Sequence, residues 1–216
     1  MTEDTRSWIR SFPTLGGAVP DLGPLPDSPI TKFLEWLEEA VAAGVPEPHA
    51  AALSTVDSTG VPDARFLILK DVTDEGFWFS GDVRSPKGVQ LGANPVAALT
   101  LYWREQGRQV RVRGVVREGG RVLSARDFRE RSVTARAVAA ASRQSESLLD
   151  PQEYTAAVES AVERIESDPT YVSDTWRAWC LAPDSVEFWQ ADPGRRHLRW
   201  VYHCDQDGWS HHELWP

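Results

Sequence analysis

Three basic side chains stand at alternate positions near the end of the chain, namely Arg195, His197 and Arg199. They follow the turn signature Asp-Pro-Gly at 192–194, and we expect a strand over 197–203. Alternate residues of a strand lie on one face, so two guanidiniums would flank an imidazole. That arrangement is typical of anion binding and proton transfer. The alternative interpretation is a solvated basic strand at a sheet edge, where charge discourages aggregation.

Basic and amide side chains also stand beside other expected elements. Arg65 and Lys70 bracket the apolar strand 66–69, and Lys87 lies in the first turn of a helix capped by Ser85. An ammonium beside the free N–H groups of a helix start favours anion binding. Further donors are Gln109, Arg111, Gln144 and Ser145. Each alone is typical of an ordinary protein surface, but together, in an acidic chain, they indicate a ligand with a phosphate and a polar ring edge.

The elements expected to position these residues are mainly closely spaced strands. Expected strands cover 50–56, 64–70, 77–80, 96–103, 109–116, 176–181, 185–190, 197–203 and 209–214. Expected helices start at Pro29, Pro86 and Ser124 and cover 134–142 and 151–165. Strands that arrive as hairpins predict a mostly β protein with attached helices (α+β), built on an antiparallel barrel rather than on βαβ units. The residues 1–26, rich in proline and glycine, are expected to form a flexible arm.

The composition narrows the possible partners. The chain has 216 residues and a net charge of −9, which disfavours binding to nucleic acid and to anionic membranes. No apolar run approaches the roughly 18 residues of a membrane-spanning helix. Cys180 and Cys204 are too few for a disulfide framework, so we expect a reduced, cytoplasmic setting. The five histidines form no HExxH or CxxC-type pattern, so we expect no metal site.

Several short motifs in the same order along the chain resemble one known family. The motifs are Arg65 to Lys70, Ser85-x-Lys87-Gly88, Asn94-Pro95-x-Ala97-Ala98-Leu99, Arg108-Gln109-Val110-Arg111, Gln144-Ser145 and Glu187-Phe188-Trp189-Gln190 followed by Arg195-x-His197-x-Arg199. With them the chain resembles the FMN-dependent pyridox(am)ine 5′-phosphate oxidases, which have a split-barrel fold. The resemblance covers residues 27–216, and it implies one FMN-binding split-barrel domain after the arm.

The resemblance also implies a site, an activity and an assembly. By it, FMN is held by Arg65, Phe66, Leu67, Ile68, Leu69, Lys70, Ser80, Gly81, Lys87, Gln109, Gln144, Ser145, Trp189 and Arg199. Arg195 and His197 are the implied catalytic residues, and Lys70, Arg131, Arg195, Arg196 and His197 the implied substrate contacts. The family forms homodimers with both subunits at each site. Its flavin takes a hydride at N5 and passes the electrons to O2, which gives hydrogen peroxide.

Two positions depart from the family pattern. The substrate-phosphate site of the family has a tyrosine where this chain has Asp127 and a serine where it has Ala135, whereas Lys70 and Arg131 remain. An aspartate beside a phosphate is repelled, and an alanine donates no hydrogen bond. The stretches 100–105 and 142–146 resemble the phenazine-biosynthesis branch of the family, which oxidises reduced tricyclic aromatic acids.

Three functions therefore stay open at this point. The first is an FMN oxidase of a planar aromatic or heteroaromatic metabolite, for which a phenazine precursor is one candidate. The second is a pyridoxine/pyridoxamine 5′-phosphate oxidase. The third is a non-catalytic flavin-binding protein, against which Arg195 and His197 argue, because FMN retention alone does not need them.

Overall fold

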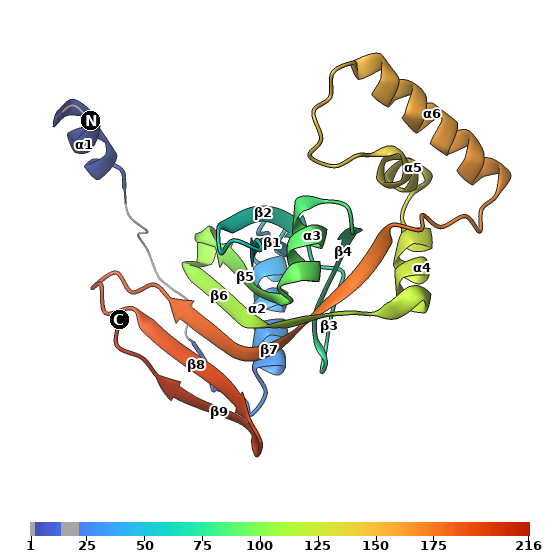
Figure 1. Cartoon of the computed structure of the whole chain (residues 1–216). Helices are drawn as coiled ribbons and strands as arrows, with labels where there is room; N and C mark the ends of the chain where they lie inside the picture. The colour runs from blue at the N-terminus through green and yellow to red at the C-terminus, as the bar shows by residue number, and fades with distance from the viewer. Residues whose placement is uncertain (1–2, 14–21) are drawn as a thin grey trace. The chain divides into compact units, whose positions relative to one another are not determined.

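The computed structural model describes residues 3–13 and 22–216 (Figure 1). Its helices are α1 (Glu3–Arg10), α2 (Pro29–Ala42), α3 (Pro86–Ala93), η1 (Arg104–Gln106), α4 (Gly120–Glu130), α5 (Val133–Ala141) and α6 (Pro151–Ser167). Its strands are β1 (Ala50–Val56), β2 (Pro62–Ile68), β3 (Asp71–Thr73), β4 (Gly76–Asp82), β5 (Val96–Trp103), β6 (Arg108–Glu118), β7 (Trp176–Gln190), β8 (Leu198–Asp205) and β9 (Gly208–Glu213).

The described residues form two compact units. Unit 1 comprises residues 1–48, 101–111 and 186–216, and unit 2 comprises residues 49–100 and 112–185. The strand order is β2-β1-β5-β6-β7-β4-β3, with β8 paired to β7 and β9 to β8. Strands β5, β6 and β7 each contribute residues to both units.

The expected N-terminal arm is partly helical. Glu3–Arg10 is helix α1, with Arg10 in its last turn, where a cation is favourable to the helix dipole. This stretch has neither glycine nor proline, so nothing in its backbone opposes a helix. Residues 1–2 and 14–21 lie outside the described part of the chain.

The β1–β2 hairpin of unit 2 follows its sequence closely. Residues of β1 alternate between half-buried and buried, and the strand pairs antiparallel with β2 from Ala50↔Ile68 to Val56↔Pro62. Asp57 closes the turn, because its Oδ1 accepts hydrogen bonds from the N–H groups of Thr59 at 2.8 Å and Val61 at 3.0 Å. The turn fixes the register that presents Arg65 beside β1.

Strand β7 is one continuous strand, where the sequence suggested two strands separated at 182–184. The neighbouring backbones come close enough to exclude side chains there. A Cβ on Gly114 would lie 2.0 Å from the carbonyl oxygen of Ala182, and one on Gly76 would lie 2.1 Å from that of Leu181. Strand β7 runs through Pro183 without the expected separation at 182–184.

An aromatic core organises unit 1. Ser28 caps α2 and Pro29 begins it, as expected from the sequence. Trp36 of this helix packs edge-on against Phe188 at 5.2 Å between ring centres. The fully buried Arg108 lies 4.4 Å from the Trp36 ring centre, and it donates to Gln190 Oε1 at 2.9 Å. Helix α2 is thereby fastened to the ends of β6 and β7.

Helical packing covers part of unit 2. Phe128 of α4 packs edge-on against Trp176 at 5.9 Å, and Ala137 of α5 clusters with Ala161 and Ile165 of α6. Figure 1 shows α5 and α6 side by side. Helix α4 begins at Gly120, four residues before the expected start at Ser124. Ser124 lies inside the helix, where its hydroxyl donates to the Gly120 carbonyl at 2.8 Å.

The two cysteines differ in exposure. Cys180 on β7 is buried and Cys204 on β8 is exposed. Burial, with a smaller contribution from Glu75, raises the pKa of Cys180 to about 11.

Candidate functional site

A cavity of about 370 Å³ in unit 2 gathers most of the residues expected to bind a phosphate-bearing ligand. It is formed by β2, β4 and the start of α3, with the segment after α5 on its rim. Nine of the expected cofactor residues line it, namely Arg65, Phe66, Leu67, Ile68, Lys70, Ser80, Gly81, Lys87 and Gln144, and Arg131 lies beside them. Among the expected neighbours, Leu69 is buried away from the cavity lining, and Ser145 lines an adjacent depression with Gln144.

Lys87 carries a buried positive charge into this cavity. Its Nζ donates to Ser85 Oγ at 3.2 Å and to Gln144 Oε1 at 3.0 Å, and it is only 7% exposed. Desolvation first, and then the charge of Arg65, lower the pKa of Lys87 below its usual value, while Asp82, which also lines the cavity, acts in the opposite direction. Within the described residues it has no carboxylate at ion-pair distance. An ammonium held in this way favours an incoming anion.

Helix α3 positions this lysine. Ser85 is the N-cap, and its Oγ accepts a hydrogen bond from the Gly88 N–H at 3.3 Å. Pro86 occupies the first helical position, where its missing N–H costs nothing. The cap and the proline, both recognised in the sequence, therefore fix Lys87 in the first turn.

Gly81 and Ser80 complete the floor of the cavity. A Cβ on Gly81 would lie 2.7 Å from Lys87 Cε and 3.0 Å from its Nζ, so only glycine leaves room for the lysine in this position. The Oγ of Ser80 is buried and has no hydrogen-bond partner in residues 3–13 and 22–216. A buried hydroxyl without a partner is costly, and a ligand oxygen or N–H would satisfy it.

Arg65 is held at the rim by several acceptors. Its Nη1 donates to the Leu53 carbonyl at 3.3 Å, and its Nη2 donates to Gln90 Oε1 at 3.1 Å and pairs with Asp63. Arg65 lowers the pKa of the exposed Asp63 carboxyl. The sequence did not indicate Gln90, because its contact with Arg65 joins α3 to β2, nor Asp63, which lies two residues before Arg65 on β2.

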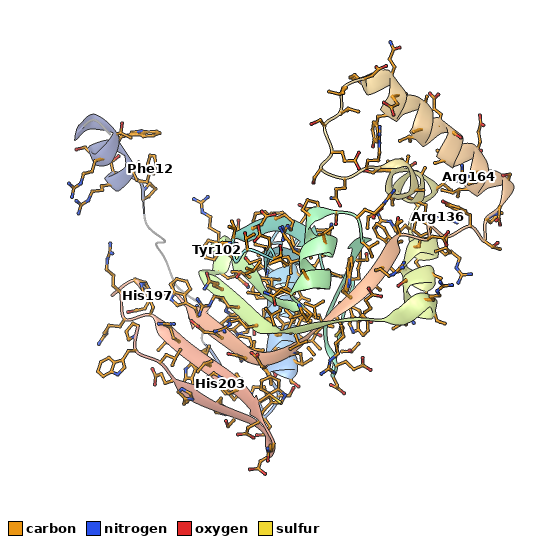
Figure 2. The ribbon with its side chains drawn as sticks, viewed as in Figure 1. Phe12, Tyr102, Arg136, Arg164, His197 and His203 are labelled. Atoms are coloured by element: carbon orange, nitrogen blue, oxygen red, sulfur yellow. The ribbon has the colours of Figure 1, made fainter. Side chains whose placement is uncertain are left out.

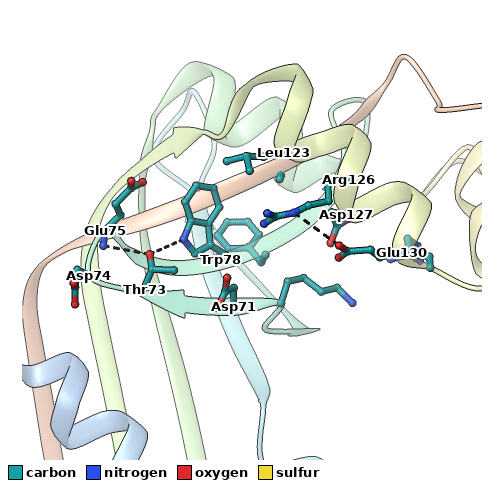
Figure 3. A pocket seen from close by; sticks show the side chains of 13 residues that line it. Asp71, Thr73, Asp74, Glu75, Trp78, Leu123, Arg126, Asp127 and Glu130 are labelled. Atoms are coloured by element: carbon teal, nitrogen blue, oxygen red, sulfur yellow. Dashed lines mark hydrogen bonds and ion pairs between the residues drawn. The ribbon is translucent and has the colours of Figure 1, made fainter. Parts of the chain in front are cut away.

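A second cavity, of about 740 Å³ in unit 2, adjoins Lys70 and Arg131 (Figure 3). It contains the two positions expected to hold a substrate phosphate. Five carboxylates line it as well, those of Asp71, Asp74, Glu75, Asp127 and Glu130. Its apolar wall includes the Trp78 indole, whose Nε1 donates to Thr73 Oγ1 at 3.0 Å. Three cations, Lys70, Arg126 and Arg131, line the cavity with these five carboxylates, so acidic side chains outnumber basic ones there.

Asp127 is fixed in the same region by a contact that the sequence did not reveal. The indole Nε1 of Trp176 donates to Asp127 Oδ2 at 2.7 Å. The Arg131 guanidinium lies 4.5 Å from the centre of the Trp176 ring, and its buried Nε has no hydrogen-bond partner in the described residues. Burial lowers the pKa of Arg131, while Asp127 acts in the opposite direction.

The remaining expected residues lie in unit 1. The rings of Trp189 and His197 are tilted by 41° with their centres 4.9 Å apart, and both line a cavity of about 730 Å³ together with Arg195. The Asp192 N–H donates to His197 Nδ1 at 3.1 Å. In the neutral imidazole this leaves the proton on Nε2, so His197 offers an N–H donor. Gln109 on β6 is half-buried.

The expected alternation of Arg195, His197 and Arg199 on one strand face is wrong. Strand β8 begins at Leu198, and Arg195 has a left-handed backbone with φ of 62° in the preceding turn. Arg199 instead pairs with Glu187, with Nε 3.0 Å from Oε1, and Glu187 also pairs with Arg111. Arg196 is exposed, and its N–H donates to Asp192 Oδ2 at 2.8 Å.

The part of the chain that the structure describes has neither a cluster of metal ligands nor a membrane-spanning helix. No group of three or more histidine, cysteine or acidic side chains is arranged there to hold a metal ion. None of its helices is long and apolar enough to cross a membrane.

Two family models match the chain. One, described as pyridoxamine 5′-phosphate oxidase, matches residues 37–190. The other, described as the pyridoxine 5′-phosphate oxidase C-terminal dimerisation region, matches residues 176–216. Together they reach from α2 to the end of the chain.

Curated relatives and solved structures agree with these matches. A pyridoxine/pyridoxamine 5′-phosphate oxidase of Thermosynechococcus vestitus is 40% identical over 190 residues, covering 88% of this chain and 90% of the relative. A pyridoxine/pyridoxamine 5′-phosphate oxidase of Burkholderia lata is 39% identical over 191 residues, covering 87% of this chain and 89% of the relative.

Among solved structures, PhzG from Burkholderia lata 383, in complex with tetrahydrophenazine-1-carboxylic acid, has a TM-score of 0.85 and 30% identity, and the match covers 93% of this chain and 98% of that one. A pyridoxamine 5′-phosphate oxidase-related, FMN-binding protein of Nostoc punctiforme has a TM-score of 0.72 at 20% identity, covering 89% and 100%. These likenesses confirm the expected antiparallel split barrel with attached helices.

Proposed function

The chain belongs to the pyridoxamine 5′-phosphate oxidase family, and from that premise we propose that it is an FMN-dependent oxidase of a small planar aromatic or heteroaromatic metabolite. When bound, FMN supplies the hydride acceptor and, in an oxidase, returns the electrons to O2 as hydrogen peroxide. The observation that carries the proposal is the cavity in unit 2 where the buried Lys87 lies without a carboxylate partner in the described residues.

The residues of this cavity fit the cofactor. Arg65 and Lys87 supply two positive charges for the phosphate, and Ser80 supplies a buried hydroxyl that needs a partner. Gly81 leaves the space in which Lys87 lies. Phe66 is 80% exposed in the cavity wall, and an aromatic ring system or a second protein surface would cover it.

Three of the proposed substrate residues, Arg195, Arg196 and His197, belong to the other unit of the chain, whereas Lys70 and Arg131 belong to unit 2. His197 offers an Nε2–H donor, and Arg195 carries a guanidinium for negative charge on the substrate. Gln109, Trp189 and Arg199 of the same unit are proposed as cofactor residues, with Trp189 as an aromatic wall. Arg196, exposed in the same turn, is kept as a proposed substrate contact.

A homodimer is part of the proposal. The match of residues 176–216 to a dimerisation region supports it, and the family resemblance implies sites formed by two subunits. The expected cofactor residues of this chain fall into both of its compact units. We assign the FMN phosphate to unit 2 residues and the face over the flavin ring to unit 1 residues.

Asp127 supports an aromatic substrate over pyridoxine 5′-phosphate. Its carboxylate acts electrostatically on Arg131, the expected ligand of a substrate phosphate, and both residues line the same cavity. A phosphate dianion in this cavity would face four further carboxylates. PhzG, a similar protein of known structure, is in complex with a tricyclic carboxylic acid.

The second candidate function is that of a pyridoxine/pyridoxamine 5′-phosphate oxidase. The curated relatives at 39–40% identity carry this name, and Lys70 and Arg131 both line the cavity that would receive the phosphate. It differs from the first proposal in a measurable way, because it requires efficient turnover of phosphorylated substrates.

One purification and one assay separate the candidates. The protein is purified, its visible spectrum is recorded after FMN is added, and its mass in solution is measured. Peroxide release is then assayed with pyridoxine 5′-phosphate, pyridoxamine 5′-phosphate and a panel of reduced aromatic acids. We expect a yellow dimer that oxidises a member of the aromatic panel more efficiently than either vitamer. A colourless protein that takes up no FMN contradicts the proposal, and preferred turnover of the vitamers establishes the second candidate.

A further inference from the structure

The cavity that contains Lys87 has a negative charge in its wall. Among the described residues that line it, only Asp82 is acidic, against the basic side chains of Arg65, Lys70, Lys87 and Arg131. Asp82 is 5% exposed. Its charge reaches Lys87, because it acts to raise the pKa of that lysine against the larger effects of desolvation and of Arg65. A phosphate that enters this cavity would be repelled by the same carboxylate.

Asp82 has a structural reason to be there. Its Oδ1 accepts a hydrogen bond from the Arg84 N–H at 2.7 Å, which closes the turn between β4 and α3. Its Oδ2 accepts from Thr175 Oγ1 at 2.8 Å, just before the start of β7. Burial raises the pKa of Asp82, but the hydrogen bonds from Arg84 and Thr175 outweigh it and hold the pKa below its usual value. The turn that precedes Lys87 therefore carries a fixed negative charge.

The Arg84 guanidinium pairs with this carboxylate through two nitrogens. Its Nε lies 3.0 Å from Asp82 Oδ1, and its Nη2 lies 2.6 Å from Oδ2. This bidentate contact is the strong form of an arginine–carboxylate ion pair. The Arg84 side chain is not part of the cavity lining, so it acts on a bound phosphate only through residues that are.

Arg84 also contacts the segment after α5. Its Nη2 donates to the Ser142 carbonyl at 3.2 Å, in an exposed position. Two residues further on, Gln144 Oε1 accepts from Lys87 Nζ at 3.0 Å. Both Ser142 and Gln144 line the cavity. Arg84 thus has two routes to a bound phosphate, which are the charge of Asp82 and the position of the segment 142–144.

The charge of Asp82 is the stronger route. A buried carboxylate that loses its guanidinium partner keeps its charge and is left uncompensated. The exposed Ser142 carbonyl would lose one hydrogen bond, which water can replace. The segment 142–144 would still be held by the contact between Gln144 and Lys87.

We propose that Arg84 is a positioning residue of the FMN site, because its guanidinium neutralises Asp82 and leaves the turn before Lys87 with a net positive charge toward the phosphate. The inference rests on the proposed function, since it takes the FMN phosphate to bind beside Lys87. It gives a role to a residue that lies outside the cavity and outside the set implied by the family resemblance.

A double-mutant cycle on Arg84 and Asp82 tests the inference. The dissociation constant for FMN is measured by flavin fluorescence in the wild type, Arg84→Gln, Asp82→Asn and the double variant. We expect Arg84→Gln to raise the constant by about tenfold, because an unpaired carboxylate then faces the phosphate. In the Asp82→Asn background the same change should alter the constant by less than about twofold, because no charge remains to be neutralised.

Two further variants sharpen the result. Arg84→Lys keeps the positive charge without the planar fork, so it should retain most of the FMN affinity. Arg164→Gln is the matched control, because Arg164, labelled on α6 in Figure 2, is also exposed and lies outside the lining of this cavity. It should bind FMN as the wild type does. Circular dichroism verifies the folding of each variant.

The outcomes separate this inference from the proposed function. An equal loss on Arg84→Gln in both backgrounds would overturn the role of the Asp82 charge and point to the Ser142 contact. Unchanged affinity in Arg84→Gln overturns the inference as well, as does a loss in Arg84→Lys or Arg164→Gln as large as that in Arg84→Gln. If the wild type binds no FMN, the proposed function itself fails, and this inference fails with it.

Discussion

The indole Nε1 of Trp176 donates a hydrogen bond of 2.7 Å to the carboxylate of Asp127. The same indole ring faces the guanidinium of Arg131 at 4.5 Å. The Trp176 side chain thus holds a carboxylate and a guanidinium together. They lie at the cavity that contains Lys70 and Arg131, the expected ligands of a substrate phosphate. Because the tryptophan fixes the carboxylate, Asp127 does not turn freely away from an incoming anion.

Substrate preference should change when Asp127 is replaced. A carboxylate a few ångströms from a phosphate costs about 1 to 4 kcal/mol, which corresponds to roughly fivefold to several hundredfold in affinity. We expect Asp127→Tyr with Ala135→Ser to raise kcat/KM for pyridoxine 5′-phosphate within that range. Asp127→Asn, which keeps an acceptor for Trp176, should give part of the gain.

The matched control for this change is Glu130→Gln. Glu130 lines the same cavity from the same helix, and its removal tests whether any lost charge has the effect. An equal gain from both variants would contradict a specific role for Asp127. A low micromolar Michaelis constant of the wild type for this substrate would contradict the premise itself.

FMN retention should depend on Arg65 and Lys87 together. The double change Arg65→Ala/Lys87→Ala removes both cations from the cavity, and we expect the purified protein to lose its yellow colour. The control is Arg121→Ala/Arg129→Ala, which removes two exposed charges on α4. Absorbance at the flavin maximum, with circular dichroism to verify folding, provides the measurement. Full flavin occupancy in the first variant would refute the assignment of the phosphate.

Gly81→Ala should weaken FMN binding without unfolding the protein. The added Cβ would lie 2.7 Å from the flexible end of Lys87 and at an ordinary contact distance of 3.4 Å from the Trp179 ring, so the lysine shifts and the backbone does not. We expect the dissociation constant for FMN to rise by about tenfold, as for loss of a charge-assisted hydrogen bond. Gly92→Ala is the control, because its Cβ meets nothing within 4 Å on α3. Unchanged affinity in Gly81→Ala would show that the position of Lys87 does not matter.

FMN affinity should fall in alkaline solution. In the free site the pKa of Lys87 is below 10.5, so its ammonium is lost as the pH rises through that lowered value. Affinity is therefore full below the lowered pKa and declines above it. Lys87→Arg keeps its charge over the same range and should show no such decline. Fluorescence titration of FMN at stepped pH measures both proteins, and identical profiles would contradict the prediction.

The free protein should show the opposite trend in stability. Burial disfavours the charged lysine in the folded state, so the unfolded chain binds the proton more tightly. The contribution of Lys87 to the free energy of unfolding therefore rises between the lowered pKa and 10.5. Chemical denaturation of FMN-free wild type and Lys87→Met, compared across this window, measures the contribution.

Catalysis should depend on the turn before β8. Arg195→Ala and His197→Ala are expected to keep the flavin spectrum and to slow anaerobic flavin reduction by about 100-fold, the usual cost of losing a positioned donor. Stopped-flow absorbance measures this step directly. Arg113→Ala, an exposed arginine on β6, is the control. Unchanged rates in both variants would mean that the turn is structural.

Local patterns predicted the elements that carry the cavity of Lys87. Strands β1 and β5 begin and end at the expected residues, because their apolar residues alternate or run continuously. Helix α3 begins at the expected residue, because Ser85 and Pro86 define its start. Strand β3, only three residues long, is not among the expected strands, because so short a segment has no periodicity to detect.

Long-range contacts account for what the sequence did not predict. The pairing of Arg199 with Glu187 and that of Asp127 with Trp176 join residues 12 and 49 positions apart. The left-handed turn at Arg195 shortened β8 by one residue at its start, and this was enough to invalidate the shared face. For Arg199 and Asp127 the sequence shows the charge of the side chain but not the residue with which it pairs.

The unequal exposure of the two cysteines offers a practical handle. At neutral pH the buried Cys180, with its raised pKa, is almost entirely protonated, so a maleimide dye should react at Cys204 alone. The natural chain can therefore carry one fluorophore per subunit without mutagenesis. Cys204 lies within the region matched to dimerisation, so energy transfer between separately labelled batches would report the rate at which subunits exchange.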